Sequence, residues 1–149
     1  MTDTGRPDLE PRHPDLLRLQ GYWRERRGDR AFPRRADIDP LDLAFMLERI
    51  ALTEVHEDPR RYRLRVVGSW WALLAGFELT GMWVDALPLA NMGKLTIETY
   101  EAVIAARRPL CAVRNAWVDD KKLGYEILLL PLSEDGTRIS MIMTGIGPS

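Results

Sequence analysis

The chain has 149 residues, of which 46% are hydrophobic and 29% are charged, and its formal net charge is -1. This length fits one domain with its own buried core, and so small a net charge provides no long-range attraction for nucleic acids or anionic membranes. The single cysteine, Cys111, excludes an internal disulfide and any zinc site built from several thiolates.

The N-terminal residues 1–11 have few apolar side chains, so we expect a disordered tail ahead of one folded domain at residues 12–149. We find no apolar core of a secretion signal and no stretch near the roughly 20 apolar residues that cross a bilayer. These absences predict a cytoplasmic protein without membrane insertion.

Pro14 opens a predicted amphipathic helix that ends at Gly28. The apolar side of this helix either packs on the sheet of its own chain or forms the interface of a homodimer. The candidate interface residues are Leu16, Leu19, Tyr22 and Trp23.

Asp39 and Pro40 have the N-cap and first-turn pattern of a second short helix, which we expect to continue through Leu47. Residues 50–56 and 61–67 predict two strands, because in the second of them apolar residues alternate with arginines. The Asp58-Pro59 step between them is typical turn chemistry, so the two strands should form a hairpin.

A short aromatic-rich helix follows, with Ser69 suited to its N-cap and Gly76 suited to a left-handed end. Residues 77–90 look irregular, and residues 91–106 return to helical spacing. Strands are predicted at 110–119, 123–132 and 137–146. In the last two, apolar residues occupy both alternating sets, which indicates that both faces are covered.

Four segments in this order resemble the PAS domain family, and within it a group of single-domain bacterial PAS proteins. They are Leu19–Arg24, Asp37–Pro40, Arg61–Gly68 and Gly76–Gly81, and the resemblance covers roughly residues 12–147. It implies an α+β fold: a five-stranded antiparallel sheet with a helical excursion between strands 2 and 3, plus the N-terminal amphipathic helix.

The resemblance also implies a non-enzymatic sensory or signalling module. Such a module would bind a small molecule, a protein partner or both, and would pass its signal to an unidentified signalling protein. No nucleic-acid partner is expected.

The residues that would hold a cofactor in other PAS groups are missing. Haem-binding members usually have a histidine on the long helix of the excursion, and residues 91–106 contain none. Light-sensing flavin members have a cysteine within a helix, whereas Cys111 begins a predicted strand. His13 and His56 have no converging partners for a metal. We therefore expect neither a cofactor nor a metal.

The chain has no pattern of a nucleophile with its base. Three carboxylates on or near the excursion, Asp85, Glu98 and Glu101, either meet a ligand or form a solvated surface. The alternative function is a small cone-shaped enzyme or carrier of the ketosteroid-isomerase type acting on an apolar ligand, with Asp85 or Glu101 as its acid or base.

Aromatic residues and methionines fall in the segments that surround the central cavity of a PAS fold. They either line a pocket for a small apolar metabolite or fill that space as a packed core. Of the adjacent Trp70 and Trp71, only one is expected to point fully inward. The candidate lining residues are Trp70, Trp71, Leu74, Trp83, Tyr100, Ile104, Met141 and Met143.

Overall fold

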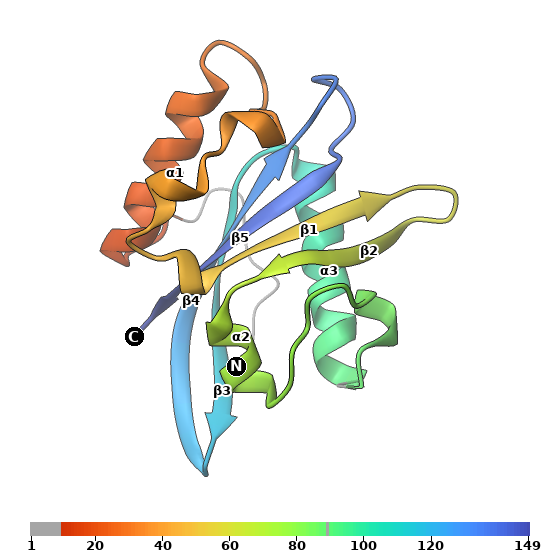
Figure 1. Cartoon of the computed structure of the whole chain (residues 1–149). Coiled ribbons are helices and arrows are strands. Elements are labelled where there is room, and N and C mark those ends of the chain that lie inside the picture. The colour runs from red at the N-terminus through yellow and green to blue at the C-terminus, as the bar shows by residue number, and fades with distance from the viewer. Residues whose placement is uncertain (1–9, 89) are drawn as a thin grey trace.

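The computed structural model of this protein describes residues 10–88 and 90–149. Its five strands form one antiparallel sheet in the order β2-β1-β5-β4-β3, so the last strand of the chain lies at the centre (Figure 1). The strands are β1 (Ile50–His56), β2 (Arg61–Val67), β3 (Leu110–Val118), β4 (Lys121–Leu132) and β5 (Met141–Pro148).

Helix α1 (Pro14–Arg27) covers one face of the sheet, against β4 and β5 (Figure 1). His13 caps its N-terminus, because the imidazole Nδ1 accepts a hydrogen bond from the Asp15 N–H (3.1 Å). Gly28 ends it with a φ of 58°, a backbone conformation that favours glycine. The predicted start and end of this helix are therefore confirmed.

The segment between β2 and β3 covers the opposite face of the sheet (Figure 1). It contains α2 (Ser69–Ala75), a 3-10 turn (Val84–Ala86) and α3 (Ala90–Ala106). The central strands β4 and β5 are thus covered on both faces, as their continuous apolar sequence predicts. The predicted five-stranded sheet with a helical excursion and an N-terminal helix is confirmed.

The predicted second short helix is not one continuous helix. Its N-cap is correct, since the Asp39 carboxylate accepts a hydrogen bond from the Leu41 N–H (3.0 Å), but the segment divides into 3-10 turns at Pro40–Leu43 and Leu47–Arg49. The predicted N-cap role of Ser69 is wrong. Gly68 occupies that position, because a Cβ there would lie 2.2 Å from the Glu48 carbonyl oxygen.

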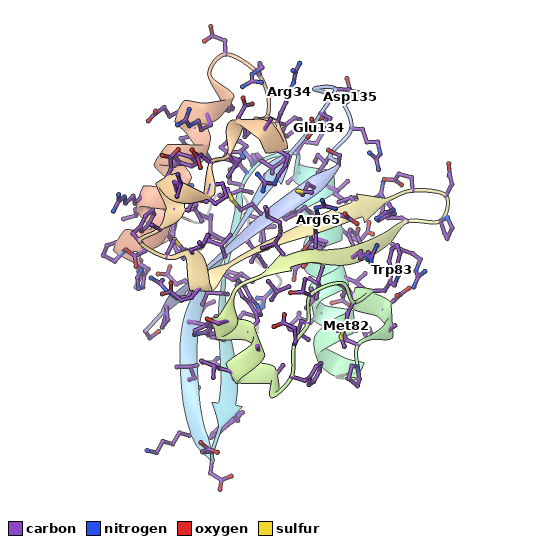
Figure 2. All side chains as sticks on the ribbon, viewed as in Figure 1. Arg34, Arg65, Met82, Trp83, Glu134 and Asp135 are labelled. Carbon is purple, nitrogen blue, oxygen red and sulfur yellow. The ribbon has the colours of Figure 1, made fainter. Side chains whose placement is uncertain are left out.

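Strand β5 begins at Met141 and not at the predicted position 137. The preceding turn uses its own hydrogen bonds: the Asp135 carboxylate accepts from the N–H groups of Thr137 and Arg138, both at 2.8 Å. Figure 2 shows Asp135 and its neighbour Glu134 at this turn. Of the expected disordered tail at 1–11, residues 1–9 lie outside the described residues.

Candidate functional site

A cavity of about 340 Å³ lies between the sheet and the segment that joins β2 to β3. This volume is in the lower part of the range of roughly 300–1,000 Å³ found for ligand pockets. Its sheet side consists of Ala51, Leu64, Val67, Arg114, Asn115, Tyr125, Ile127, Leu129, Thr144 and Ile146. Its cover consists of Trp71, Leu74, Leu79, Val84, Leu87, Leu95, Thr96, Thr99 and Tyr100.

Strand alternation determines which side chains reach this cavity. Thr144 of β5 pairs with Leu129 of β4, and Ile146 pairs with Ile127, and all four line the cavity. Because successive side chains of a strand point to opposite faces, the intervening Gly145 faces α1. The inner face of β4 and β5 is therefore a mainly apolar floor, on which Thr144 and Tyr125 are the two residues that carry hydroxyl groups.

Arg114 is the one charged side chain among the described residues that line the cavity. Arg114 is only 5% exposed, and its Nη2 donates a hydrogen bond to Thr99 Oγ1 on α3 (2.8 Å). The Thr99 hydroxyl in turn donates to the Leu95 carbonyl oxygen (2.8 Å), which is part of the helix backbone. These contacts fix the guanidinium between β3 and α3.

Tyr100 presents its ring to the cavity and its hydroxyl to the sheet. The hydroxyl lies 2.9 Å from the Thr53 hydroxyl on β1, and both side chains are buried. Burial raises the pKa of Tyr100 to about 12, so the phenol stays protonated at neutral pH. Tyr62, whose ring centroid is 4.9 Å away, extends this aromatic layer toward the surface and donates a hydrogen bond to Glu101.

Thr144 differs from the other buried hydroxyls of the cavity wall. The residue is 4% exposed, yet its Oγ1 has no hydrogen-bond partner within the described part of the chain. A buried hydroxyl without a partner costs about 1–3 kcal/mol relative to a paired one. The cavity therefore holds a polar atom that a bound molecule could satisfy.

Three of the predicted lining residues, Trp71, Leu74 and Tyr100, lie on the cavity wall. The two adjacent tryptophans differ as expected for neighbours on a helix. Trp71 reaches the cavity, whereas Trp70 packs its ring edge-on against Tyr125, with centroids 5.2 Å apart, and is absent from the lining.

Trp83 lies outside the cavity, beside β2, as Figure 2 shows. Its ring packs between the His56 ring (4.9 Å between centroids) and the Arg61 guanidinium (4.2 Å). The backbone bridge between Trp83 and Arg63 holds it at this sheet edge. The sequence predicted that Trp83 lines the cavity, but its ring packs against cationic and aromatic neighbours on the outside of the sheet edge.

The other three candidates pack within the core without lining the cavity. Met141 and Met143 belong to the set of β5 side chains that alternates with Thr144 and Ile146, so they point to the α1 side of the sheet. Ile104 is partly buried against the core near the end of α3.

The three candidate carboxylates also lie outside the cavity. Asp85 is paired with Arg61, with both oxygens at 2.9 Å, and this ion pair lowers the pKa of Asp85. Glu101 binds Arg60 (3.1 Å) and the Tyr62 hydroxyl, and Glu98 is exposed. Asp85 and Glu98 border a separate surface hollow between the 3-10 turn and α3.

The apolar side of α1 packs within its own chain. Leu16 and Leu19 are fully buried, and Trp23 donates a hydrogen bond from its indole N–H to the Pro131 carbonyl oxygen of β4 (2.9 Å). Tyr22 remains partly exposed and donates to Asp42 (2.8 Å). Leu16, Leu19 and Trp23 therefore pack against their own chain, and the homodimer interface stays a prediction.

Sequence reasoning missed Arg114 and Thr144. The signal for Arg114 was present, because Leu110, Ala112 and Arg114 share one side of the alternating strand, and the first two are fully buried apolar residues. A charged residue in such a series is unusual. Thr144 gives no such signal, since a threonine in a strand is common.

Over the described residues, no three histidine, cysteine, aspartate or glutamate side chains gather closely enough to hold a metal ion. Within the same residues, every helix is too short or too polar to span a membrane.

Comparisons with known proteins identify the family of this chain. A family model described as PAS domain matches residues 11–146. Among solved structures, the PAS domain of BvgS from Bordetella pertussis is similar, with a TM-score of 0.44 and 14% identity, covering 65% of this chain and 71% of that chain. A search of curated proteins finds no match.

Proposed function

This chain belongs to the PAS domain family, and we propose that it is a non-enzymatic sensory module that binds a small, mainly apolar molecule in its cavity. The observation that carries this proposal is the cavity itself, which has apolar walls and a few fixed polar groups. That combination is typical of small-molecule sites. A fully packed core would leave no such space.

The signal would pass through β5 to α1. Thr144 and Ile146 face the cavity, and Gly145 between them lies against Leu19 of α1, where a Cβ would come within 2.5 Å. A small shift of this strand therefore alters the packing of the helix. A ligand can drive such a change only through different affinities for the two arrangements. We propose that a protein partner reads the state of α1.

A homodimer and a cytoplasmic location belong to the same proposal. Leu16, Leu19 and Trp23 are buried in their own chain, so a dimer that keeps this packing would use the outer side of α1, where Leu17 is 45% exposed. A stable interface buries about 800 Å² on each partner, so it would need further residues besides Leu17.

An enzyme of the ketosteroid-isomerase type needs an acid or base that faces the cavity. The described lining residues include neither an aspartate nor a glutamate. This composition favours the non-enzymatic proposal over an enzyme of the ketosteroid-isomerase type.

Binding of N-phenyl-1-naphthylamine, an uncharged fluorescent probe, tests the proposal. We expect saturable one-to-one binding to the wild-type protein, and at least about tenfold weaker binding to Ala51→Phe, which fills the cavity from β1. Trp117→Ala, which removes a 71% exposed side chain, is the matched control and should bind like the wild type. Equal binding to Ala51→Phe, or none to the wild type, would contradict the proposal.

A further inference from the structure

The chemical class of the ligand can be inferred from the charge on the cavity wall. Arg114 is 5% exposed, and its hydrogen bond to Thr99 (2.8 Å) holds the guanidinium at this wall. The wall around Arg114 is otherwise mostly apolar. A cationic group in this setting attracts a negatively charged ligand group more strongly than it would in water.

A second, independent observation points to a bound molecule. Thr144 lines the same cavity, and its Oγ1 is buried without a partner among the described residues. The sheet register separates the two groups: Arg114 pairs with Tyr125, and Thr144 pairs with Leu129, four residues along β4. That offset corresponds to about 13 Å along the strand, and β3 and β5 lie a further roughly 10 Å apart across β4.

The space between the two polar positions is apolar. Ile127 and Ile146 lie in the intervening row of the sheet and both line the cavity. A ligand that occupies this space needs an apolar body between its polar ends. Its length along the strand is close to that of a medium-length carbon chain.

We propose that the cavity binds an amphipathic monocarboxylate, with its carboxylate at Arg114 and its apolar body along Ile127 and Leu129. This inference rests on the proposed function. A carboxylate matches the planar donor geometry of a guanidinium. A phosphate monoester carries about −1.5 to −2 charges at neutral pH, more than one arginine compensates in a buried site. The Thr144 hydroxyl binds a second polar group at the far end of the ligand.

The test is displacement of N-phenyl-1-naphthylamine by decanoate, decanol and 10-hydroxydecanoate, each below its micelle concentration. For the wild type, we expect decanoate to displace the probe at a concentration about tenfold lower than decanol does, as for a charge-assisted hydrogen bond. In Arg114→Met this preference for decanoate should disappear, because the variant lacks the charged donor. The wild type should release the probe at a lower concentration of 10-hydroxydecanoate than of decanoate, and this difference should be lost in Thr144→Val.

The outcomes separate this inference from the proposed function. If the probe binds but decanol competes as well as decanoate, the carboxylate assignment is overturned and the cavity function stands. If the wild type binds no probe, the proposed function itself fails. If circular dichroism shows that Arg114→Met does not fold, the comparison of decanoate with decanol on the wild type decides the assignment alone.

Discussion

Gly145 of β5 lies directly against Leu19 of α1: a Cβ at position 145 would lie 2.5 Å from Leu19 Cδ2 and 3.2 Å from Leu16 Cδ2. This contact brings α1 close to the central strand. Gly145→Ala should destabilise the protein by about 1–3 kcal/mol, because the buried leucines must move out of well-packed positions. Urea unfolding measures the free energy of unfolding directly.

Gly21→Ala is the matched control for this substitution. Gly21 lies within α1, and a Cβ there would meet nothing within 4 Å. Alanine has the higher helix propensity, so this variant should be more stable than the wild type by about 0.5–1 kcal/mol. Equal effects of the two substitutions would show that α1 does not pack on β5 as described.

The indole of Trp23 holds α1 to β4 through its hydrogen bond to the Pro131 carbonyl oxygen. Trp23→Phe keeps most of the aromatic surface and removes the donor, which leaves a buried carbonyl without its partner. We expect a loss of about 1–3 kcal/mol in the free energy of unfolding. Trp117→Phe, at a 71% exposed position, should change it by less than about 0.5 kcal/mol.

The burial of Tyr100 predicts a pH dependence of stability. Its pKa is raised from 10.0 to about 12, so the unfolded chain releases this proton at a lower pH than the folded protein does. The stabilisation from the protonated phenol is complete below the pKa of Tyr100 in the unfolded chain. It is lost as the pH rises through the pKa of Tyr100 in the folded protein. The free energy of unfolding should therefore fall by up to about 1.4 kcal/mol per pH unit for this group.

Tyr100→Phe tests this assignment. The variant is less stable at neutral pH, because the buried Thr53 hydroxyl loses its 2.9 Å partner. It also lacks the titrating phenol, so the difference in the free energy of unfolding between it and the wild type should shrink between pH 10 and about 12. Burial also raises the pKa values of Tyr62 and Tyr125, so both proteins keep part of the slope. A constant deficit across this window would contradict the assignment.

Cys111 should be chemically inert in the folded protein. It is 1% exposed, and burial, with a smaller contribution from Glu126, raises its pKa to about 12. The reactive thiolate is therefore scarce at about pH 8. We expect the thiol to react with Ellman's reagent at least about 100-fold more slowly in buffer than in concentrated urea. Comparable rates would place Cys111 at the surface.

The elements that the sequence predicts accurately begin and end at residues that favour turns or helix ends. The strands β1 and β2 match their predicted ranges because apolar alternation ends at a Glu57–Arg60 turn, and α1 matches because Pro14 and Gly28 mark its ends. The start of β5 was missed because the side chain of Asp135, not the apolar pattern, organises the preceding backbone.

The cavity residues were harder to predict. The face of the sheet to which a side chain points depends on pairing with strands from distant parts of the chain. Met143 has the same apolar character as its neighbours, and only the register with β1 and β4 assigns it to the α1 side. Trp83 was predicted to line the cavity because its segment surrounds the central cavity of a PAS fold, but the arginines of β2 provide cation–π partners at the sheet edge. Arg114 shows the converse, a charged residue placed inside by strand alternation.

The most direct test of ligand binding is intermolecular NOE measurement by NMR with methyl-labelled protein and decanoate. A ligand in the cavity predicts NOEs from the decanoate chain to the methyl groups of Ile127 and Leu129, and none to Leu16 or Leu19 on the α1 side. NOEs confined to exposed leucines such as Leu41 or Leu73 would contradict binding in the cavity, and the absence of all NOEs would contradict binding of decanoate.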